Sequence, residues 1–441
     1  MSNIGFSEVK ITPKAKSVPM GGYAPTRYST GVHDELFARA MYFSDGKEET
    51  IIISVEVVCI YYRFIQRMRK KISEKTGVRP ENILISSHHN HSGPDTLGLF
   101  DIKGFFTPTF NLKMMTQIEL KIVKSAVLAK KNAKPGKIGL EKRIFEKRVM
   151  LNRRDPQKDT KYDLSVLRVN SDDGEMRGLL TNYACHVTTL PRDNTLLTGE
   201  FPGYLVRRIK DLTKNKVFSM YTNGPCGDLN PNLYPENEPF HLITKERLSK
   251  SSYGEFNRLG NYKTTIRIGY SLGESALEIA KTINCSEIKD IKVVSKIINI
   301  PLKDMMEDNS RKSIMRHISF IFKKLLITTL LNYNRSNMSY VSFVKKRGNW
   351  YFQTELQAIK INDILILSVP GELFVDLGKK VISKSPIKKT FIIELGNDWI
   401  GYLYPPEEYF RGGYETGIVS FSPVAGIYVY NKMLNLLNNF K

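Results

Sequence analysis

Residues 64–95 read FIQRMRKKISEKTGVRPENILISSHHNHSGPD, and this stretch sets the fold class of the chain. Apolar residues recur every four positions from Phe64 to Ile72, which predicts an amphipathic helix that ends near Gly77. The apolar run Ile83–Ile85 then predicts a short buried strand, and a cluster of polar residues follows it directly. A helix, a buried strand and polar residues at the strand end are typical of an α/β protein.

The same alternation continues outward from this stretch. Further buried strands are predicted at Ile51–Ile53, Leu179–Leu180 and Ile364–Val369, and a second amphipathic helix at about 112–131. The sequence contains neither a recognisable internal repeat nor a Gly/Ser linker. We therefore expect mixed β-sheets flanked by helices, forming a single large catalytic domain over residues 1–441.

Composition excludes several classes of protein. Hydrophobic residues make up 41% and charged residues 25% of the chain, as in ordinary globular proteins. The formal net charge of +22 would suit nucleic acid or an anionic membrane, but the lysines are scattered and no nucleic-acid recognition motif accompanies them. We expect no nucleic-acid partner, and four widely spaced cysteines that stay reduced. No export signal or membrane span is visible, which favours a cytoplasmic location.

One basic segment stands apart from the rest of the sequence. Residues from about 305 to 346 contain RKSIMRHISFIFKKLLITTLL and resemble an insertion. We expect a helical excursion on the surface that packs on the core. The alternative is a lid or an element that contacts an anionic membrane peripherally.

The polar cluster SSHHNHSGPD holds three histidines in four residues, directly after the predicted strand. If the chain stays extended there, His89 and His91 point to one side and His88 to the other. Two imidazoles on one side could face one metal ion, or a metal ion and its water. A histidine pair alone is more often a surface group, so further ligands are needed.

Three other places supply candidate ligands. His186 ends an apolar run, where a neutral, metal-bound imidazole is tolerated, although it could equally be a hydrogen-bonded core histidine. Glu372 follows the buried run ILILSVPG and precedes a predicted helix, where it could bind a metal or cap the helix. Residues 396–417 are expected to form a loop rich in tyrosine, whose phenol oxygens can bind zinc or donate hydrogen bonds.

Taken together, these motifs resemble the neutral, non-lysosomal ceramidases and their bacterial relatives. The resemblance runs from residue 4 to about 420, and it is carried, in family order, by GFSEVKITP, GVHDELFARA, HNHSGP, the NR of LNRR, ACH, CGDLNPN, PGE and GYLYPPEEYFRGGYE. It implies a zinc-dependent amidohydrolase acting on a small-molecule or lipid N-acyl substrate such as a ceramide-like lipid.

The resemblance also implies a set of site residues. Zinc would be bound by His89, His186, Glu372 and Tyr402, and the reaction centre would be lined by His91, Arg153 and Tyr414. Water activated by the metal would attack the carbonyl carbon, because bound zinc can lower the pKa of water to about 7. His91 would then move protons, while Arg153 and Tyr414 would orient the substrate or stabilise the oxyanion.

Two departures from the family pattern qualify this interpretation. Ceramidases carry a serine in a GDxSPN stretch, whereas this chain has Asn230 there, so a covalent serine mechanism is disfavoured. Asp228 and Asn230 are instead expected to shape the loop or bind substrate. The family also has a carboxyl-terminal β-sandwich, and this sequence ends about 25 residues after the tyrosine-rich stretch.

Two other functions remain as alternatives. The chain could be a non-catalytic relative that keeps zinc or lipid but has lost hydrolysis, which the replacement by Asn230 would explain. It could also be a basic module that binds anionic membranes or nucleic acid through residues 305–346. The sequence does not specify the acyl chain, the amine or the oligomeric state.

Overall fold

The computed structural model describes residues 2–14, 17–23, 27–97, 111–234, 259–301, 342–346, 349–418 and 423–441. Most of the basic segment expected at about 305–346 lies outside these residues. Within the described part of that segment, residues 343–346 form a short strand.

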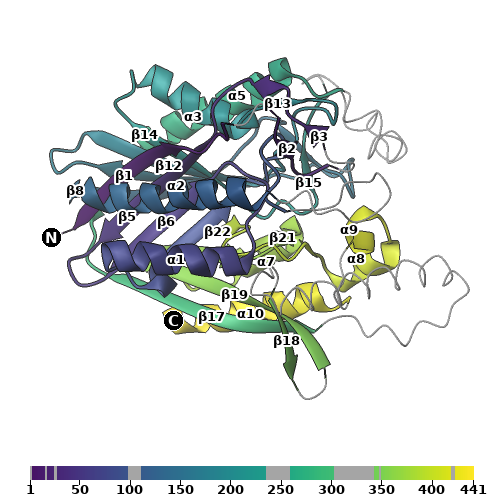
Figure 1. Ribbon diagram of the computed structural model, residues 1–441. Coiled ribbons are helices and arrows are strands. Elements are labelled where there is room, and N and C mark those ends of the chain that lie inside the picture. Colours follow the sequence, from purple (N-terminus) through teal and green to yellow (C-terminus); the bar gives the residue numbers. More distant parts are fainter. Residues whose placement is uncertain are drawn as a thin grey trace, which may run out of the picture.

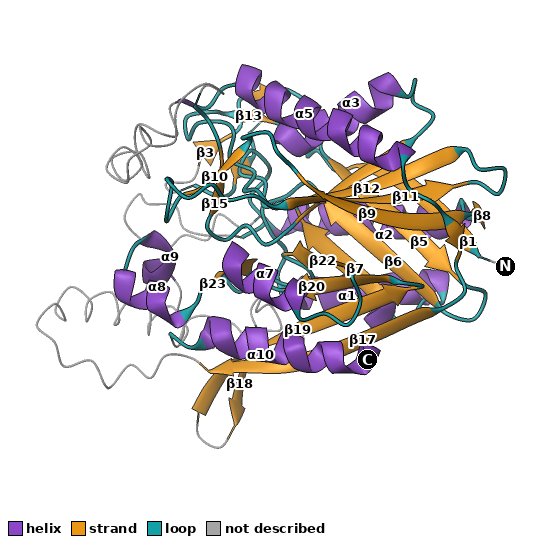
Figure 2. Cartoon of the chain, turned by 180° about the vertical axis from the view of Figure 1, so that it is seen from behind, coloured by secondary structure: helices purple, strands orange, loops and turns teal. Residues whose placement is uncertain are grey.

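Three five-stranded sheets form the framework (Figures 1 and 2). In sheet order, the first contains β7 (Ile83–Ser87), β6 (Glu49–Val55), β5 (Phe37–Ser44), β1 (Asn3–Lys10) and β8 (Lys134–Pro135). The second contains β14 (Phe218–Asn223), β12 (Met176–Tyr183), β11 (Asp163–Asn170), β9 (Lys137–Ile144) and β16 (Ser286–Glu287). The third contains β22 (Lys389–Glu394), β20 (Ile364–Val369), β19 (Asn349–Ile361) and β17 (Ile291–Pro301), with β18 (Phe343–Lys346) also paired to β19.

Helices and short strand pairs complete the described chain. The helices are α1 (Tyr62–Thr76), α2 (Leu112–Lys131), α3 (Glu200–Leu212), α5 (Tyr262–Lys281), α7 (Val375–Ser383), α8 (Pro406–Arg411), α9 (Tyr414–Ile418) and α10 (Ala425–Leu437), with 3-10 turns at Pro80–Asn82 and Asn438–Phe440. The two-stranded pairs are β2 (Pro19–Met20) with β3 (Arg27–Tyr28), β4 (Gly31–Val32) with β13 (Leu196–Leu197), β10 (Met150–Asn152) with β15 (Leu229–Pro231), and β21 (Glu372–Leu373) with β23 (Tyr402–Leu403).

The three sheets share one topology, which repeats along the chain. Each begins with three strands paired antiparallel, continues through a helix to a fourth strand parallel to the third, and ends with a second helix. The first unit is β1–β5–β6–α1–β7–α2, the second is β9–β11–β12–α3–β14–α5, and the third is β17–β19–β20–α7–β22–α10. The sequence analysis found no repeat, so the repetition is one of topology.

Two loops of each unit matter for the site. We call the segment between the third strand and the following helix the crossover loop, and the segment after the fourth strand the return loop. Parallel neighbouring strands have their carboxyl ends at the same edge of a sheet, so the two loops of a unit emerge side by side. Each unit therefore presents two loops at one edge.

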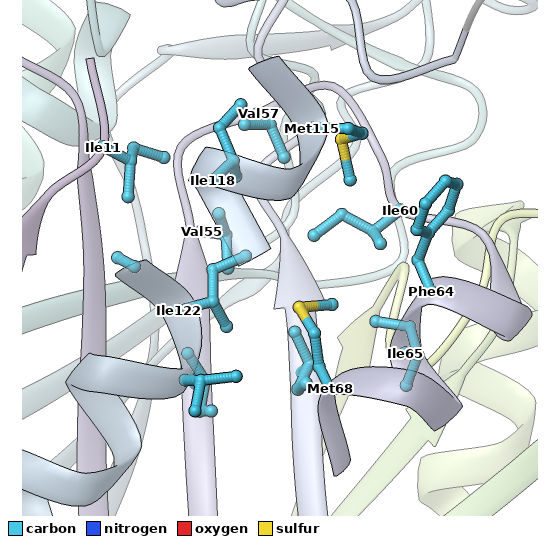
Figure 3. Packing of buried hydrophobic residues seen from close by; sticks show 14 of the residues in the cluster. Ile11, Val55, Val57, Ile60, Phe64, Ile65, Met68, Met115, Ile118 and Ile122 are labelled. Carbon is cyan, nitrogen blue, oxygen red and sulfur yellow. The ribbon is translucent and has the colours of Figure 1, made fainter. Parts of the chain in front are cut away.

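The core sits on both faces of every sheet. In the first sheet, Ile51 and Ile53 of β6 face α1 and α2, whereas Ile52 between them packs with side chains of the other two sheets. This alternation follows from the two-residue period of a strand. Figure 3 shows the outer layer, where Phe64 and Met68 of α1 approach side chains of α2 and β6. The sheets thus meet at a shared inner core, and the helices cover their outer faces.

Most of the predicted elements are confirmed. The helix expected from Phe64 to Ile72 is α1, and Gly77 ends it in the left-handed conformation with φ of 76°. The helix expected at about 112–131 is α2, and the four apolar runs lie in β6, β7, β12 and β20. One expectation was wrong, because residues 396–417 are not only loop but contain β23, α8 and most of α9.

Two further features bear on the sequence analysis. Cys59, Cys185, Cys226 and Cys285 are all free thiols, as expected. Among the helices of the described residues, none combines the length and the apolar character needed to cross a membrane.

Candidate metal centre

Three candidate ligands, one from each unit, meet at the edge where the strand-end loops emerge. His89 lies in the return loop of the first unit, His186 in the crossover loop of the second, and Glu372 in the crossover loop of the third. Their ligand atoms lie within 4.8 Å of one another, and all three residues are buried. Glu372 Oε2 is 3.3 Å from His89 Nε2 and 3.0 Å from His186 Nε2.

The partner of the other ring nitrogen selects the tautomer of each histidine in its neutral form. His89 Nδ1 lies 3.2 Å from the carbonyl oxygen of Val58, and His186 Nδ1 lies 2.7 Å from that of Cys226. A carbonyl oxygen only accepts hydrogen bonds, so each neutral imidazole carries its hydrogen on Nδ1 and directs the lone pair of Nε2 toward Glu372. Two lone pairs and a carboxylate oxygen then converge, an arrangement that a bound cation would stabilise. The donor set therefore fits a metal ion such as zinc.

Burial and charge act in opposite directions at these ligands. Burial lowers the pKa of His186 to about 4, and the nearby Arg153 guanidinium contributes to this shift, so the imidazole is uncharged at neutral pH. Burial disfavours the ionised form of Glu372, but a proton on Nε2 of His89 or His186, which face it without a metal, holds the pKa of this carboxyl well below its ordinary value. Neutral imidazoles and a carboxylate are the forms that bind metals.

The backbone at His89 differs from the expected extended conformation. Its φ of 61° lies in the left-handed region, which costs energy for a residue with a side chain. Even so, His89 and His91 lie on the same side, with ring centroids 4.7 Å apart, whereas His88 Nε2 lies 2.5 Å from Ser54 Oγ in the interior. The predicted side of each histidine is correct, although the predicted backbone is not.

His91 lies beside the ligand cluster with both ring nitrogens available. Its ring is 4.7 Å from that of Tyr23, and in the described part of the chain neither of its buried nitrogens has a hydrogen-bond partner. A Cβ atom at Gly22 would lie 2.4 Å from the His91 ring, so this glycine makes room for the imidazole. Burial, with His89 and His186 nearby, lowers the pKa of His91 well below its ordinary value.

Arg153 is held rigidly by three neighbouring groups. It follows β10 and donates to Glu415 Oε1 (2.7 Å), Asn230 Oδ1 (3.0 Å) and the carbonyl oxygen of Gly227 (2.6 Å). Its guanidinium carbon lies 5.3 Å from the centroid of the Tyr402 ring. Burial opposes its charge, but Tyr402 and Glu415 outweigh this effect and raise its pKa.

The two predicted tyrosines lie next to each other near the ligands. Tyr402 is paired in register with Glu372 between β23 and β21, and its ring stacks on that of His186 at 6.4 Å. Tyr414, at the start of α9, has its ring centroid 6.0 Å from that of Tyr402 and is 42% exposed. Tyr402 is therefore near the ligands, and Tyr414 lies on the solvent side of it.

The structure gives Asp228 and Asn230 distinct contacts. Asp228 accepts hydrogen bonds from the backbone N–H of Val375 (2.8 Å) and from Asn152 Nδ2 (2.6 Å), so it fixes the start of α7. Burial raises its pKa to about 6. Asn230, in β15, accepts from Arg153. Both side chains thus shape the surroundings of Arg153.

Two important groups were missed by the sequence analysis. Trp399 Nε1 donates to Glu372 Oε1 at 2.9 Å, and Glu415 accepts from both Arg153 and Arg154. Both residues lie in the 396–417 stretch, which drew notice only for its tyrosines. A buried acidic residue beside two consecutive arginines cannot be recognised from sequence, because the pairing is between residues about 260 positions apart.

Comparisons with known proteins agree with this geometry. Residues 3–299 match the model of the family described as neutral/alkaline non-lysosomal ceramidase, N-terminal. A neutral ceramidase of Drosophila pseudoobscura pseudoobscura is 26% identical over 259 residues, covering 52% of this chain and 36% of that protein. A neutral ceramidase of Pseudomonas aeruginosa is 24% identical over 258 residues, covering 54% of this chain and 38% of that protein. The matches thus span little more than a third of these curated relatives.

Solved structures extend the likeness of the fold to the whole chain. The crystal structure of neutral ceramidase from Pseudomonas aeruginosa superposes with a TM-score of 0.73 and 18% identity, covering 100% of this chain and 74% of that one. A ceramidase in complex with C2 superposes with a TM-score of 0.74 and 17% identity, covering 100% of this chain and 75% of that one. At these identities the superpositions establish the fold, mixed sheets flanked by helices.

Proposed function

The chain belongs to the neutral/alkaline non-lysosomal ceramidase family, and from this premise we propose that it is a zinc-dependent hydrolase that cleaves the amide bond of an N-acyl substrate, with a ceramide-like lipid as the first candidate. The observation that carries the proposal is the convergence of His89, His186 and Glu372 on one point, each from a different sheet. We also propose that residues 1–441 act as one catalytic domain, because the site needs loops of all three units.

The metal would be held by these three residues and by Tyr402, whose ring lies against His186. Zinc suits a set of nitrogen and oxygen donors, and when bound it would act as a Lewis acid that lowers the pKa of a water to about 7. Everything else in the reaction would come from side chains of the chain itself.

Those side chains divide into a proton carrier and two orienting groups. His91 has two buried nitrogens beside the ligands, and neither has a hydrogen-bond partner among the residues that the structure describes. It would therefore hold or move a proton at the leaving nitrogen of the substrate. The guanidinium of Arg153, fixed by Glu415 and Gly227, would direct its positive charge at the carbonyl oxygen of the substrate. Tyr414 would donate a hydrogen bond from the solvent side.

The experiment that tests this proposal is product release from a panel of N-acyl amides and esters, ceramide included. The protein would be stripped with a chelator and then restored with zinc. We expect turnover only after zinc is restored, and loss of both turnover and zinc binding in Glu372→Gln and His89→Asn. Retention of full activity in either variant would contradict the ligand assignment.

Two substitutions of the same kind serve as controls. Glu119→Gln changes a carboxylate of α2 that is equally buried but pairs with Arg67 of α1. His33→Asn changes a histidine that pairs with Asp34. Both are expected to bind zinc as the wild-type protein does.

A non-catalytic role is the second candidate, and Asn230 is the observation that favours it. Its amide oxygen accepts from Arg153 where the family has a serine. Stoichiometric zinc binding together with lipid binding, but without turnover of any amide or ester, would support this alternative over hydrolysis.

A further inference from the structure

Each metal ligand is fixed by an atom from the other strand-end loop of its own unit. In the first unit the ligand His89 comes from the return loop, and its Nδ1 meets the carbonyl oxygen of Val58 in the crossover loop. In the second unit His186 comes from the crossover loop, and its Nδ1 meets the carbonyl oxygen of Cys226 in the return loop. The same relation holds twice.

The third unit completes the pattern with a side chain. Glu372 comes from the crossover loop, and its Oε1 accepts a hydrogen bond of 2.9 Å from the indole N–H of Trp399 in the return loop. A carboxylate has two oxygens that can both bind a metal, whereas an imidazole facing the site has one nitrogen. The second oxygen of Glu372 therefore needs a hydrogen-bond donor, whereas the Nδ1–H groups of the two histidines need hydrogen-bond acceptors.

We propose that Trp399 is a positioning residue for the metal centre. Its indole N–H occupies Glu372 Oε1 and leaves only Oε2 to bind the ion. This inference rests on the proposed function. Indole suits the task because its nitrogen only donates, so it cannot itself compete for the cation. A single carboxylate oxygen and two imidazoles leave room on the ion for Tyr402 and for the reacting groups.

The surroundings of Trp399 hold its ring in one orientation. Its backbone N–H donates to Asp398 Oδ1 at 2.8 Å, and the Tyr61 ring meets it edge to face with centroids 6.0 Å apart. The ring also packs against the core between the first sheet and its helices. A residue of the third unit is thus anchored on the first, which couples the direction of Glu372 to the loop that carries Val58.

The first test compares zinc affinity in the wild-type protein, Trp399→Phe and Tyr61→Phe, measured by competition with a chelator of known affinity. Trp399→Phe keeps an aromatic ring but loses the N–H, and we expect it to bind zinc about 10- to 100-fold more weakly. Tyr61→Phe keeps the packing around Trp399 and is expected to bind as tightly as the wild-type protein. Unchanged affinity in Trp399→Phe would overturn the inference.

Cobalt in place of zinc adds a readout that a purely structural role would not change. With Oε1 released in Trp399→Phe, both oxygens of Glu372 could bind, so the visible absorption of the cobalt protein should weaken as the coordination number rises. An absorption spectrum identical to that of the wild-type cobalt protein would contradict the positioning role.

A second measurement needs no change at Trp399 and so does not depend on how Trp399→Phe folds. The sequence has two tryptophans, so 15N-tryptophan labelling gives two indole signals, which Trp350→Phe would assign. We expect the Trp399 signal to be protected from solvent exchange and to shift in step with one equivalent of zinc. If the Trp399 indole signal does not change when zinc binds, the positioning role of Trp399 is wrong, but the proposed function is unaffected. If the wild-type protein binds no zinc, the proposed function is wrong as well.

Discussion

At the scale of single residues, Glu200 is a buried carboxyl that, among the described residues, has no charged group in direct contact. It accepts hydrogen bonds from Ser92 Oγ (2.7 Å) and from the backbone N–H (2.5 Å) and hydroxyl (2.8 Å) of Thr189. Burial dominates these bonds and raises its pKa from 4.5 to about 7. Ser92 lies in the return loop that carries His91, and Thr189 lies in the crossover loop that carries His186, so Glu200 ties these two loops together.

We predict that Glu200→Gln changes the pH dependence of stability. The folded-state pKa lies above that of the unfolded chain, so the stability from this proton is complete below about pH 4.5 and is lost as pH rises through 7. Glutamine does not titrate, so the free energy of unfolding of the variant relative to wild type should increase by up to about 3 kcal/mol from pH 4.5 to pH 8. Urea unfolding of the metal-free proteins measures this.

An exposed carboxyl provides the comparison for this prediction. Glu175 lies in a surface turn, so Glu175→Gln should change the free energy of unfolding by less than about 0.5 kcal/mol. The prediction fails if the difference in the free energy of unfolding between Glu200→Gln and the wild-type protein does not vary with pH. That result would show that Glu200 is already ionised in the folded protein at pH 4.5.

The residues that could be predicted from sequence were those with a local signature. His89, His186 and Glu372 each follow an apolar run at a strand end, and the structure brings them together. Trp399 could not be found in this way, because its partner Glu372 is 27 positions away and nothing in the intervening sequence specifies their contact. Nor does the sequence reveal the left-handed backbone of His89.

At the scale of elements, α3 and α5 cross at a point that only glycine permits. A Cβ atom at Gly269 would lie 2.6 Å from the carbonyl oxygen of Phe201 and 2.6 Å from the Cβ of Tyr204. Backbone and Cβ atoms cannot move aside as the end of a flexible side chain can. Close helix packing over the second sheet therefore depends on this residue.

We predict that Gly269→Ala destabilises the protein by about 1–3 kcal/mol, because the added methyl group forces the helices apart. This outweighs the gain of up to about 1 kcal/mol that alanine brings to a helix interior. Ser275→Ala on the same helix should change stability by less than about 0.5 kcal/mol. Chemical unfolding of the three proteins tests this, and a more stable Gly269→Ala would refute the close crossing.

The short helices α8 and α9 are attached to the loop after β10 by charge. Arg154 donates to Glu408 Oε2 (2.8 Å), to Glu415 Oε2 (3.1 Å) and to the carbonyl oxygen of Gly412 (2.7 Å). The side chains of Glu408 and Glu415 are largely buried in this arrangement, at 12% and 4% exposed. Arg154 thus holds the segment that carries Tyr414.

We predict that Arg154→Gln loosens this segment. Each hydrogen bond to a charged group contributes about 1.5–3 kcal/mol, so the loss of even one of these bonds should speed local hydrogen exchange in residues 406–418 by at least about 10- to 100-fold. Arg411→Gln removes a more exposed pair with Glu408 and should change exchange little. Equal exchange rates in Arg154→Gln and wild type would show that the segment is held by its apolar contacts instead.

Elements were predictable from sequence where a periodic pattern was long. The helices α1 and α2 run over 15 and 20 residues, and both could be recognised from their spacing of apolar residues. In contrast, α8 and α9 have six and five residues, too few to establish a helical period. Their positions depend on the charged contacts described above, which join them to a distant loop.

At the scale of the whole molecule, the three units share the inner core and bring their strand-end loops together at the candidate metal centre. A metal ion bound by His89, His186 and Glu372 would cross-link the three units at the edge where their strand-end loops emerge. The repeated topology escaped the sequence analysis because strands of alternating pattern and amphipathic helices occur in any α/β protein. Topology depends on which strands pair, and that is decided by long-range contacts.

We predict that zinc stabilises the whole molecule and not one unit alone. At a free concentration 100-fold above its dissociation constant, a ligand specific for the folded state adds about 2.7 kcal/mol. Thermal unfolding should therefore show a higher midpoint with zinc than with chelator, in a transition that covers the full loss of structure. His186→Ala should lose the shift and His33→Ala should keep it. Separate transitions, only one of which responds to zinc, would contradict the proposal of a single domain.

The distance along the chain between the ligands has a consequence for the cell that makes this protein. His89 and Glu372 are 283 positions apart (372 minus 89), so at about 5–20 residues per second the ribosome needs roughly 15–60 s to add this glutamate after the first histidine ligand. During that interval two units can fold while the centre lacks its only carboxylate. Loading with metal is thus postponed until the third unit is being made, and a chain terminated before Glu372 would be left with histidines that cannot retain the ion.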